Sequence, residues 1–165
     1  MSSNIELVNS ELNGGFLSGF VESSVEKPAD GRNGECTVHY SGKYSKYEMV
    51  VSLVNGVREG EAIILNDGIP YLNLEYERGV LTGAVERMND YGIVELRGHL
   101  VNGIENGLFL EYDENEKVVW IGYYQNGQRH LEVRNRIMKQ DYSQEDGSGE
   151  FYELDENGKV TQLCL

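Results

Sequence analysis

The chain has 165 residues, with 28 acidic and 14 basic side chains and a formal net charge of -14. This charge repels the phosphates of nucleic acids and the anionic face of a cytoplasmic membrane, so neither is an expected partner. The 20 glycines, 11 tyrosines and 2 prolines indicate one domain of short strands joined by many turns.

The N-terminal stretch "MSSNIELVNSEL" lacks the basic and apolar segments of a signal peptide, and no apolar run is long enough to span a membrane. Cys36 and Cys164 lie far apart and without the spacing of metal ligands. We therefore expect a soluble, cytoplasmic protein with free thiols and with no metal or cofactor.

Residues 1–32 contain "LNGGFLSGF" at 12–20, which is interpreted as a degenerate first copy of a repeat that becomes regular downstream. A sheet built from repeats needs its ends covered, because terminal units otherwise expose an apolar face. Residues 1–32 are therefore predicted to form an N-terminal cap.

A regular repeat occupies residues 33–130. Its marker is a pair of turn residues that recurs after 23, 24 and 24 residues: Asn55-Gly56, Arg78-Gly79, Asn102-Gly103 and Asn126-Gly127. A second glycine follows four residues later in the first three copies, at Gly60, Gly83 and Gly107, whereas the fourth copy has Leu131. A period of this length is typical of repeat proteins.

The segment before each pair alternates between apolar and polar residues, which predicts a strand with one buried face. The positions seven, five and three residues before the glycine form the buried columns: Met49, Leu72, Leu96 and Trp120; Val51, Leu74, Gly98 and Gly122; Leu53, Tyr76, Leu100 and Tyr124. A second apolar run follows each second glycine, so each repeat is predicted to be strand, turn, strand.

The recurring glycines are interpreted as backbone geometry. An Asn-Gly pair accepts positive φ angles, which a tight hairpin requires, and the second glycine is expected to let the next strand start without a Cβ clash. A phosphate-binding loop is not expected, because no helix signal or Lys-Ser/Thr follows. The predicted structural glycines are Gly56, Gly60, Gly79, Gly83, Gly103, Gly107, Gly127 and Gly149.

Residues 131–165 depart from the period. The stretch 131–144 is predicted to be either a strand pair of different length or a short helix. Residues 149–160, "GEFYELDENGKV", closely match residues 107–118, "GLFLEYDENEKV", and predict the opening half of another hairpin. We expect 131–165 to form the C-terminal cap of a single domain that covers 1–165.

The repeat resembles the MORN repeat. The segment "VVWIGYYQNGQRH" carries the Gly-x-aromatic-x-Asn-Gly core of that family at Gly122, Tyr124 and Asn126-Gly127, although the usual Gly-x-Gly after the turn is reduced to one glycine. The resemblance implies an elongated, twisted, single-layer antiparallel sheet of consecutive hairpins. It also implies a scaffold for other proteins, and in some members contact with membranes.

The sharpest candidate for a binding site lies in the fourth copy, where the polar alternation is lost. Val119, Ile121 and Tyr123 are expected to share a face opposite Val118, Trp120 and Tyr124. Either Leu131, Val133, Ile137 and Met138 cover this patch, or a partner does. If a partner does, Ile121→Lys should preserve the fold and abolish binding.

Two other groups of residues have a structural and a functional interpretation. The tyrosines and Trp120 either cover a thin sheet or form a recognition groove. His39, His99 and His130 share no spacing and are expected at the surface, while "DENEK" and "DENGK" are expected to be turns.

No catalytic set is evident in the sequence. The predicted function is a non-enzymatic interaction or scaffolding module that binds a protein partner and, through its open sheet edges, possibly a second copy of itself. The alternatives are a membrane- or lipid-associating protein, which the acidic charge disfavours, and an antitoxin-like binder of another protein.

Overall fold

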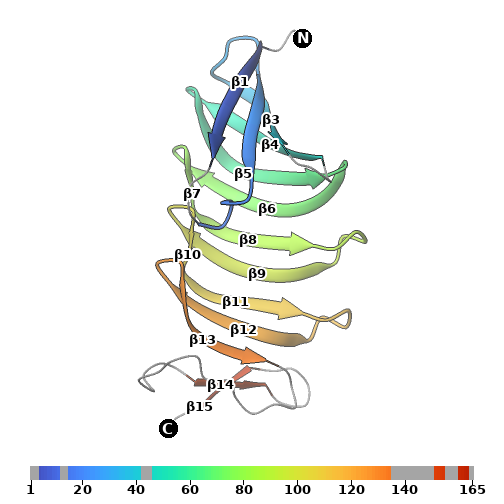
Figure 1. The fold of residues 1–165 in the computed structure, drawn as a ribbon, viewed down its shortest axis with the longest axis vertical. Helices are drawn as coiled ribbons and strands as arrows, with labels where there is room; N and C mark the ends of the chain where they lie inside the picture. Colours follow the sequence, from blue (N-terminus) through green and yellow to red (C-terminus); the bar gives the residue numbers. More distant parts are fainter. Residues whose placement is uncertain (1–3, 12–14, 42–45, 135–150, 155–159, 164–165) are drawn as a thin grey trace.

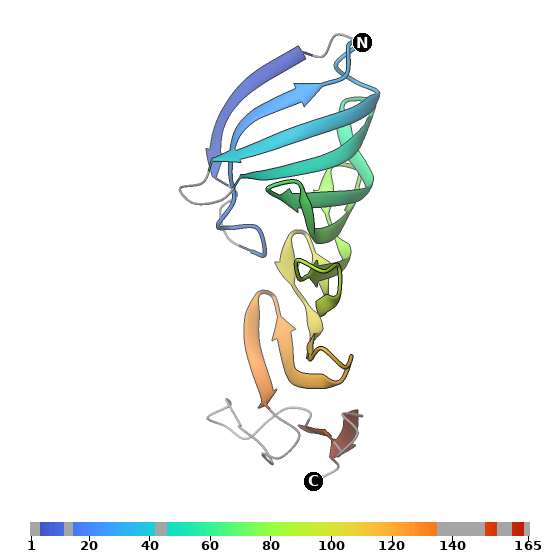
Figure 2. The same ribbon diagram turned by 90° about the vertical axis from the view of Figure 1, so that its right-hand side faces the viewer.

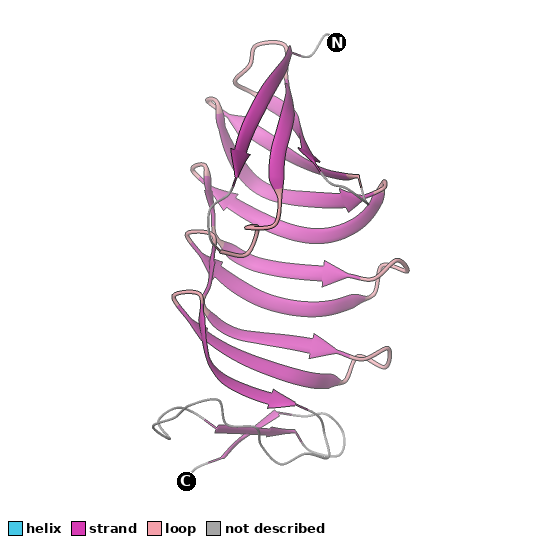
Figure 3. Cartoon of the chain, in the orientation of Figure 1, coloured by secondary structure: helices cyan, strands magenta, loops and turns pink. Residues whose placement is uncertain are grey.

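The computed structural model describes residues 4–11, 15–41, 46–134, 151–154 and 160–163, and it defines the side chains of 15–41 and 46–130. Every regular element in this part of the chain is a β-strand, which confirms the all-β prediction (Figure 3). The strands stack into an elongated ladder in which consecutive strands are neighbours (Figure 1).

One open antiparallel sheet contains 13 strands in the order β1-β2-β3-β4-β5-β6-β8-β9-β11-β12-β13, with β7 paired to β6 and β10 to β9. Two further strands form a separate sheet. The bounds are β1 (Asn4–Glu11), β2 (Val21–Lys27), β3 (Gly34–Ser41), β4 (Tyr47–Val54), β5 (Val57–Asn66), β6 (Ile69–Glu77), β7 (Val80–Leu81), β8 (Gly83–Met88), β9 (Val94–Val101), β10 (Ile104–Glu105), β11 (Gly107–Tyr112), β12 (Val118–Gln125), β13 (Gln128–Arg134), β14 (Phe151–Leu154) and β15 (Val160–Leu163).

The four predicted turn pairs close hairpins. Both residues of each pair have positive φ, from 50° to 52° at the first residue and from 77° to 85° at the glycine. Two consecutive positive φ angles define the turn whose twist matches that of the flanking strands. These turns line the left-hand edge of the sheet in Figure 1, as the sequence pattern predicted.

The second glycines have a different role from the one predicted. Gly60, Gly83 and Gly107 have φ angles of 81°, 89° and 88°. A Cβ placed on Gly60 or Gly107 would meet no atom within 4 Å, so the expected Cβ clash is absent there. Glycine is favoured because the chain bulges at this point and adopts a left-handed conformation that L-residues avoid.

Successive turns are joined to one another by backbone hydrogen bonds. The glycine N–H of each pair donates to a carbonyl in the preceding hairpin, from Gly56 to Arg32, Gly79 to Arg58, Gly103 to Leu81 and Gly127 to Glu105, at 2.6 to 2.9 Å. These bonds satisfy donors that a lone hairpin would leave to solvent. They hold each repeat in register with the one before it.

The predicted apolar columns lie on one face, here called the inner face, which is concave in the side view (Figure 2). Met49, Val51 and Leu74 are among its fully buried side chains, and Trp120 and Tyr124 are half-buried at its far end. The column glycines carry aromatic rings. A Cβ on Gly98 would lie 2.3 Å from the ring of Phe109, and one on Gly122 would lie 2.4 Å from the ring of Trp120.

Residues 15–20, here called the inner plug, cross the inner face and form no strand, so the interpretation of this stretch as a degenerate repeat is wrong. The Phe16 N–H donates to the Gly103 carbonyl at 2.9 Å, and Leu17 is only 2% exposed within the core. Residues 12–14, which complete the sequence motif, lie outside the described residues. The plug gives a single-layer sheet a small second layer.

The C-terminal predictions are settled in part. Residues 131–134 belong to strand β13, whereas 135–144 lie outside the described residues. β14 and β15 pair with each other, which confirms strand structure in the predicted half-hairpin at 149–160, although Gly149 itself lies outside the described residues.

Candidate functional site

The three predicted partner-binding residues are not equivalent. Ile121 is completely buried and forms a small outer-face cluster with Val118, against which Leu110 and Tyr112 pack. Val119 and Tyr123 are half-buried. Ile121 is therefore not accessible to a partner in this structure, and the candidate patch is reduced to two partly accessible side chains.

A β-bulge explains why the predicted faces are wrong near Val119. In the pairing of β11 with β12, Glu111 lies opposite Trp120 and Tyr112 opposite Val118, so Val119 is an extra residue. The same bulge occurs at Tyr71 in β6 and at Glu95 in β9. Because a bulge interrupts the alternation of side chains, Val118 joins Ile121 instead of the Trp120 and Tyr124 column.

The expectation for Ile121→Lys changes accordingly. A lysine at a completely buried position would place a charge without a partner in the outer-face cluster, so the substitution should destabilise the fold. The backbone of Ile121 pairs with Val133, and that of Tyr123 with Leu131. The other two proposed covering residues, Ile137 and Met138, lie outside the described residues.

At the N-terminal end of the inner face, the sheet rolls over until β2 faces β5 across β3 and β4. The carboxylate of Glu22 and the guanidinium of Arg58 meet at 2.8 Å, with side chains only 8% and 20% exposed. Burial disfavours the charge on Arg58, but Tyr76 and Glu22 beside it hold its pKa above the ordinary value. Burial raises the pKa values of Tyr40 and Tyr76 as well.

The rolled end is also filled by aromatic rings. Phe20 of the inner plug makes edge contacts with Tyr40 and Tyr47 at centroid distances of 5.2 and 5.1 Å, and Tyr47 lies 5.6 Å from Tyr71. A cavity of about 210 Å³ remains beside the ion pair, lined by Glu22, Val25, Lys27, Cys36, Leu53, Gly56 and Arg58. This volume is below that of ordinary small-molecule sites.

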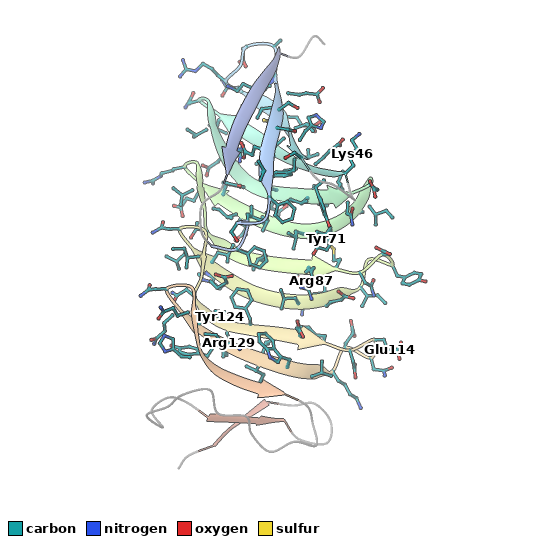
Figure 4. The ribbon with its side chains drawn as sticks, viewed as in Figure 1. Lys46, Tyr71, Arg87, Glu114, Tyr124 and Arg129 are labelled. Atoms are coloured by element: carbon teal, nitrogen blue, oxygen red, sulfur yellow. The ribbon has the colours of Figure 1, made fainter. Side chains whose placement is uncertain are left out.

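At the other end of the inner face, a row of aromatic rings runs from the plug toward the last hairpin. Phe109 lies 6.2 Å from Phe16 on one side and 5.1 Å from Tyr124 on the other. Trp120 and Tyr124 both lie over Gly122, and both are half-buried. We call Phe109, Trp120 and Tyr124 the aromatic surface; Figure 4 shows Tyr124 near the lower end of the ladder, and Tyr71 above it over β6.

Charged side chains border the aromatic surface. Glu111 lies opposite Trp120 in the pairing of β11 and β12, and its carboxylate is 3.6 Å from the guanidinium of Arg87. On the outer face, Arg97 pairs with Glu86 at 2.8 Å and lies over the ring of Tyr112 at 5.5 Å.

The remaining polar candidates have structural roles in the described part of the chain. His39 lies between Glu26 and Glu48, at 3.3 and 3.4 Å, and His99 is exposed. "DENEK" is a turn, as predicted, because the Asp113 carboxylate accepts hydrogen bonds from the N–H groups of Asn115 and Lys117.

Two kinds of membrane or metal signature were sought in the described residues. No group of His, Cys, Asp and Glu side chains there is arranged to hold a metal ion. None of the described segments forms a helix of the length and apolar character that crossing a membrane requires. A second depression, of about 190 Å³, is lined mainly by Glu61, Asn73, Glu75 and Glu86.

Comparisons of the chain with protein-family models, curated proteins and solved structures found no match. The aromatic surface and the rolled end thus rest on the geometry alone.

Sequence reasoning missed the inner plug and the Glu22–Arg58 pair. The signal for the plug was the apolar content of "GGFLSGF", where two phenylalanines and a leucine occur among glycines without the alternation of a strand. Large apolar residues in a glycine-rich connection need something to pack against, and here it is the inner face. The ion pair left no local signal, because it joins residues 36 positions apart across two strands.

Proposed function

We propose that the chain is a non-enzymatic module that binds another protein through its inner face, in keeping with its resemblance to MORN repeats. The observation that carries the proposal is the half-buried aromatic surface at the C-terminal end of the sheet. Tryptophan and tyrosine supply large contact areas at a small cost in conformational entropy, and they are enriched among residues that dominate binding energies.

The position of the aromatic surface supports this choice over the outer face. Phe109 is fixed by Phe16 on one side and by Tyr124 on the other, so the rings are held in place before any partner arrives. Preorganised side chains lose little freedom on binding. On the outer face, by contrast, Ile121 is buried and the neighbouring Arg97 already pairs with Glu86.

Adjacent tyrosines on opposite sides of β12 allow a matched test. Tyr124 contacts Phe109 on the inner face, whereas Tyr123 accepts a hydrogen bond from Gln125 at 3.2 Å and pairs with Leu108. Tagged wild-type, Tyr124→Ala and Tyr123→Ala chains would be used for affinity capture from the native cell, with quantitative mass spectrometry. Thermal unfolding of each chain would show that it is folded.

We expect Tyr124→Ala to lose the specific partner at least tenfold, and Tyr123→Ala to retain it. Equal capture by the two variants would contradict an inner-face interface. Loss with Tyr123→Ala alone would instead locate binding on the outer face, where the sequence pattern first suggested it.

A further inference from the structure

The inner plug is a segment of this chain that is already bound to the inner face, and it shows what that face accepts. Gly15 packs so closely that a Cβ would lie 2.3 Å from the Gly103 carbonyl oxygen. The next residue donates its N–H to that carbonyl and places its ring beside Phe109. The contact thus consists of a glycine, one backbone hydrogen bond and an aromatic ring.

The row of rings continues beyond the part of the face that the plug contacts. Phe16, Phe109 and Tyr124 follow one another at centroid distances of 6.2 and 5.1 Å, and Phe109 between them is only 3% exposed. Trp120 and Tyr124, which come next, remain half-buried. A further ring at this end would extend the intramolecular interface by one step, in the edge-on or offset contacts that aromatic pairs prefer.

The charge around the aromatic surface specifies the sign of the partner. From β9 through the last Asn-Gly turn and the following two residues, residues 94–129, six carboxylates stand against three cations. The carboxylates are Glu95, Glu105, Glu111, Asp113, Glu114 and Glu116, and the cations are Arg97, Lys117 and Arg129. With the chain as a whole at -14, a basic partner is attracted and an acidic one repelled.

We propose that the aromatic surface binds a basic segment of a partner protein that presents an aromatic side chain from a glycine-containing turn, as residues 15–20 do within the chain. This inference rests on the proposed function and adds to it the chemistry of the partner. The partner's ring packs against Tyr124 and Trp120, and its flanking lysines or arginines lie near the surrounding carboxylates.

The single tryptophan of the chain provides a direct measurement, because Trp120 belongs to the proposed site. The probe is the synthetic peptide KKGFLSGFKK, whose central six residues reproduce residues 15–20 and which contains no tryptophan. Its binding to the wild-type chain would be followed at low ionic strength through the emission of Trp120. EEGFLSGFEE tests the charge, and KKGALSGAKK tests the aromatic rings.

We expect a saturable change in Trp120 emission with KKGFLSGFKK, at least tenfold weaker binding of EEGFLSGFEE, and no saturable change with KKGALSGAKK. Binding should weaken at least tenfold in Tyr124→Ala and less than twofold in Tyr123→Ala, with Trp120 present in both. Salt should weaken the lysine-flanked peptide most, because the attraction is screened.

The inference is overturned if KKGFLSGFKK produces no saturable change, if the glutamate-flanked peptide binds equally well, or if Tyr124→Ala and Tyr123→Ala bind alike. Should these peptides fail while Tyr124→Ala still loses captured proteins, the partner chemistry is wrong and the proposed function stands. The proposed function fails on a different result, equal capture of proteins by the two tyrosine variants.

Discussion

The two halves of the sheet are built from similar hairpins but treat their inner face differently. In the N-terminal half the sheet rolls over, the Glu22–Arg58 pair bridges β2 and β5, and Phe20 packs between Tyr40 and Tyr47. In the C-terminal half the last hairpins lie open, and Trp120 and Tyr124 remain half-buried. The comparison shows that a repeat fixes the strands, while residues outside the repeat decide which part of the face stays accessible.

The bridge across the rolled half gives the largest expected effect. Replacing Glu22 by leucine leaves the Arg58 guanidinium, with a side chain 20% exposed, without its carboxylate. Breaking a buried ion pair by removing one partner costs about 3 to 5 kcal/mol, so Glu22→Leu should lower the free energy of unfolding by roughly 3 kcal/mol. Urea unfolding measures this loss.

The double variant Glu22→Leu/Arg58→Met serves as the control, because it removes both charges and keeps similar volumes. Replacing a buried pair by apolar residues is often neutral or stabilising, so much of the lost stability should return. A double variant as unstable as the single one would mean that the charges themselves are not what the rolled half depends on.

The contact between glycine and ring sharpens the comparison on the open side. Gly98→Ala would place a Cβ 2.3 Å from the ring of Phe109, which is fixed between Phe16 and Tyr124. Such overpacking costs about 1 to 3 kcal/mol. Gly19→Ala is the matched control, since a Cβ there meets no atom within 4 Å; thermal denaturation should separate the two variants clearly.

The attachment of the inner plug is tested by two glycines with similar backbone conformations. Gly15 and Gly31 have φ angles of 79° and 68°, but only at Gly15 does an added Cβ meet a neighbour, the Gly103 carbonyl oxygen. Alanine at either position incurs the left-handed strain of about 1 to 2 kcal/mol. Gly15→Ala should lose about 1 kcal/mol more than Gly31→Ala, a difference of the size of one hydrogen bond. Equal losses in chemical denaturation would show that the plug is not held by this contact.

The smallest effect concerns the turn that departs from the repeat. Arg78 has a φ of 51° at the position that asparagine occupies in the other three copies. Asparagine tolerates this conformation better than arginine, so Arg78→Asn should raise the free energy of unfolding by about 0.5 kcal/mol. The hydrogen bond from the N–H of residue 78 to Glu59 does not involve the side chain that is changed. A loss of stability would mean that the arginine side chain makes contacts that matter.

The sequence predicted the hairpins well because their determinants are local. Asn-Gly pairs set the turns, and the alternation around Val51 and Leu74 set the inner face. The bulge at Val119 was not predicted, because an extra residue in one strand shows only when the register of both strands is known. For that reason Val118 was assigned to the wrong face, and Ile121 was expected at an interface although it is buried.

Long-range features were beyond the pattern for a related reason. The roll that brings Glu22 to Arg58 depends on twist accumulated over several strands, and no spacing in the sequence reports it. Part of the candidate site was nevertheless visible, since the sequence analysis offered Trp120 and the tyrosines as a recognition groove. What it lacked was the inner plug, which determines where along the face those rings remain accessible.

Hydroxyl-radical footprinting of the chain, alone and bound to its captured partner, tests the central claim most directly. The oxidation of individual aromatic side chains would be read by mass spectrometry. An inner-face interface in the open half predicts strong protection of Trp120 and Tyr124, and unchanged oxidation of Tyr123 and of Tyr91, which is 89% exposed in a turn. Protection of Tyr123 or Tyr91 with Trp120 and Tyr124 unchanged would contradict the account.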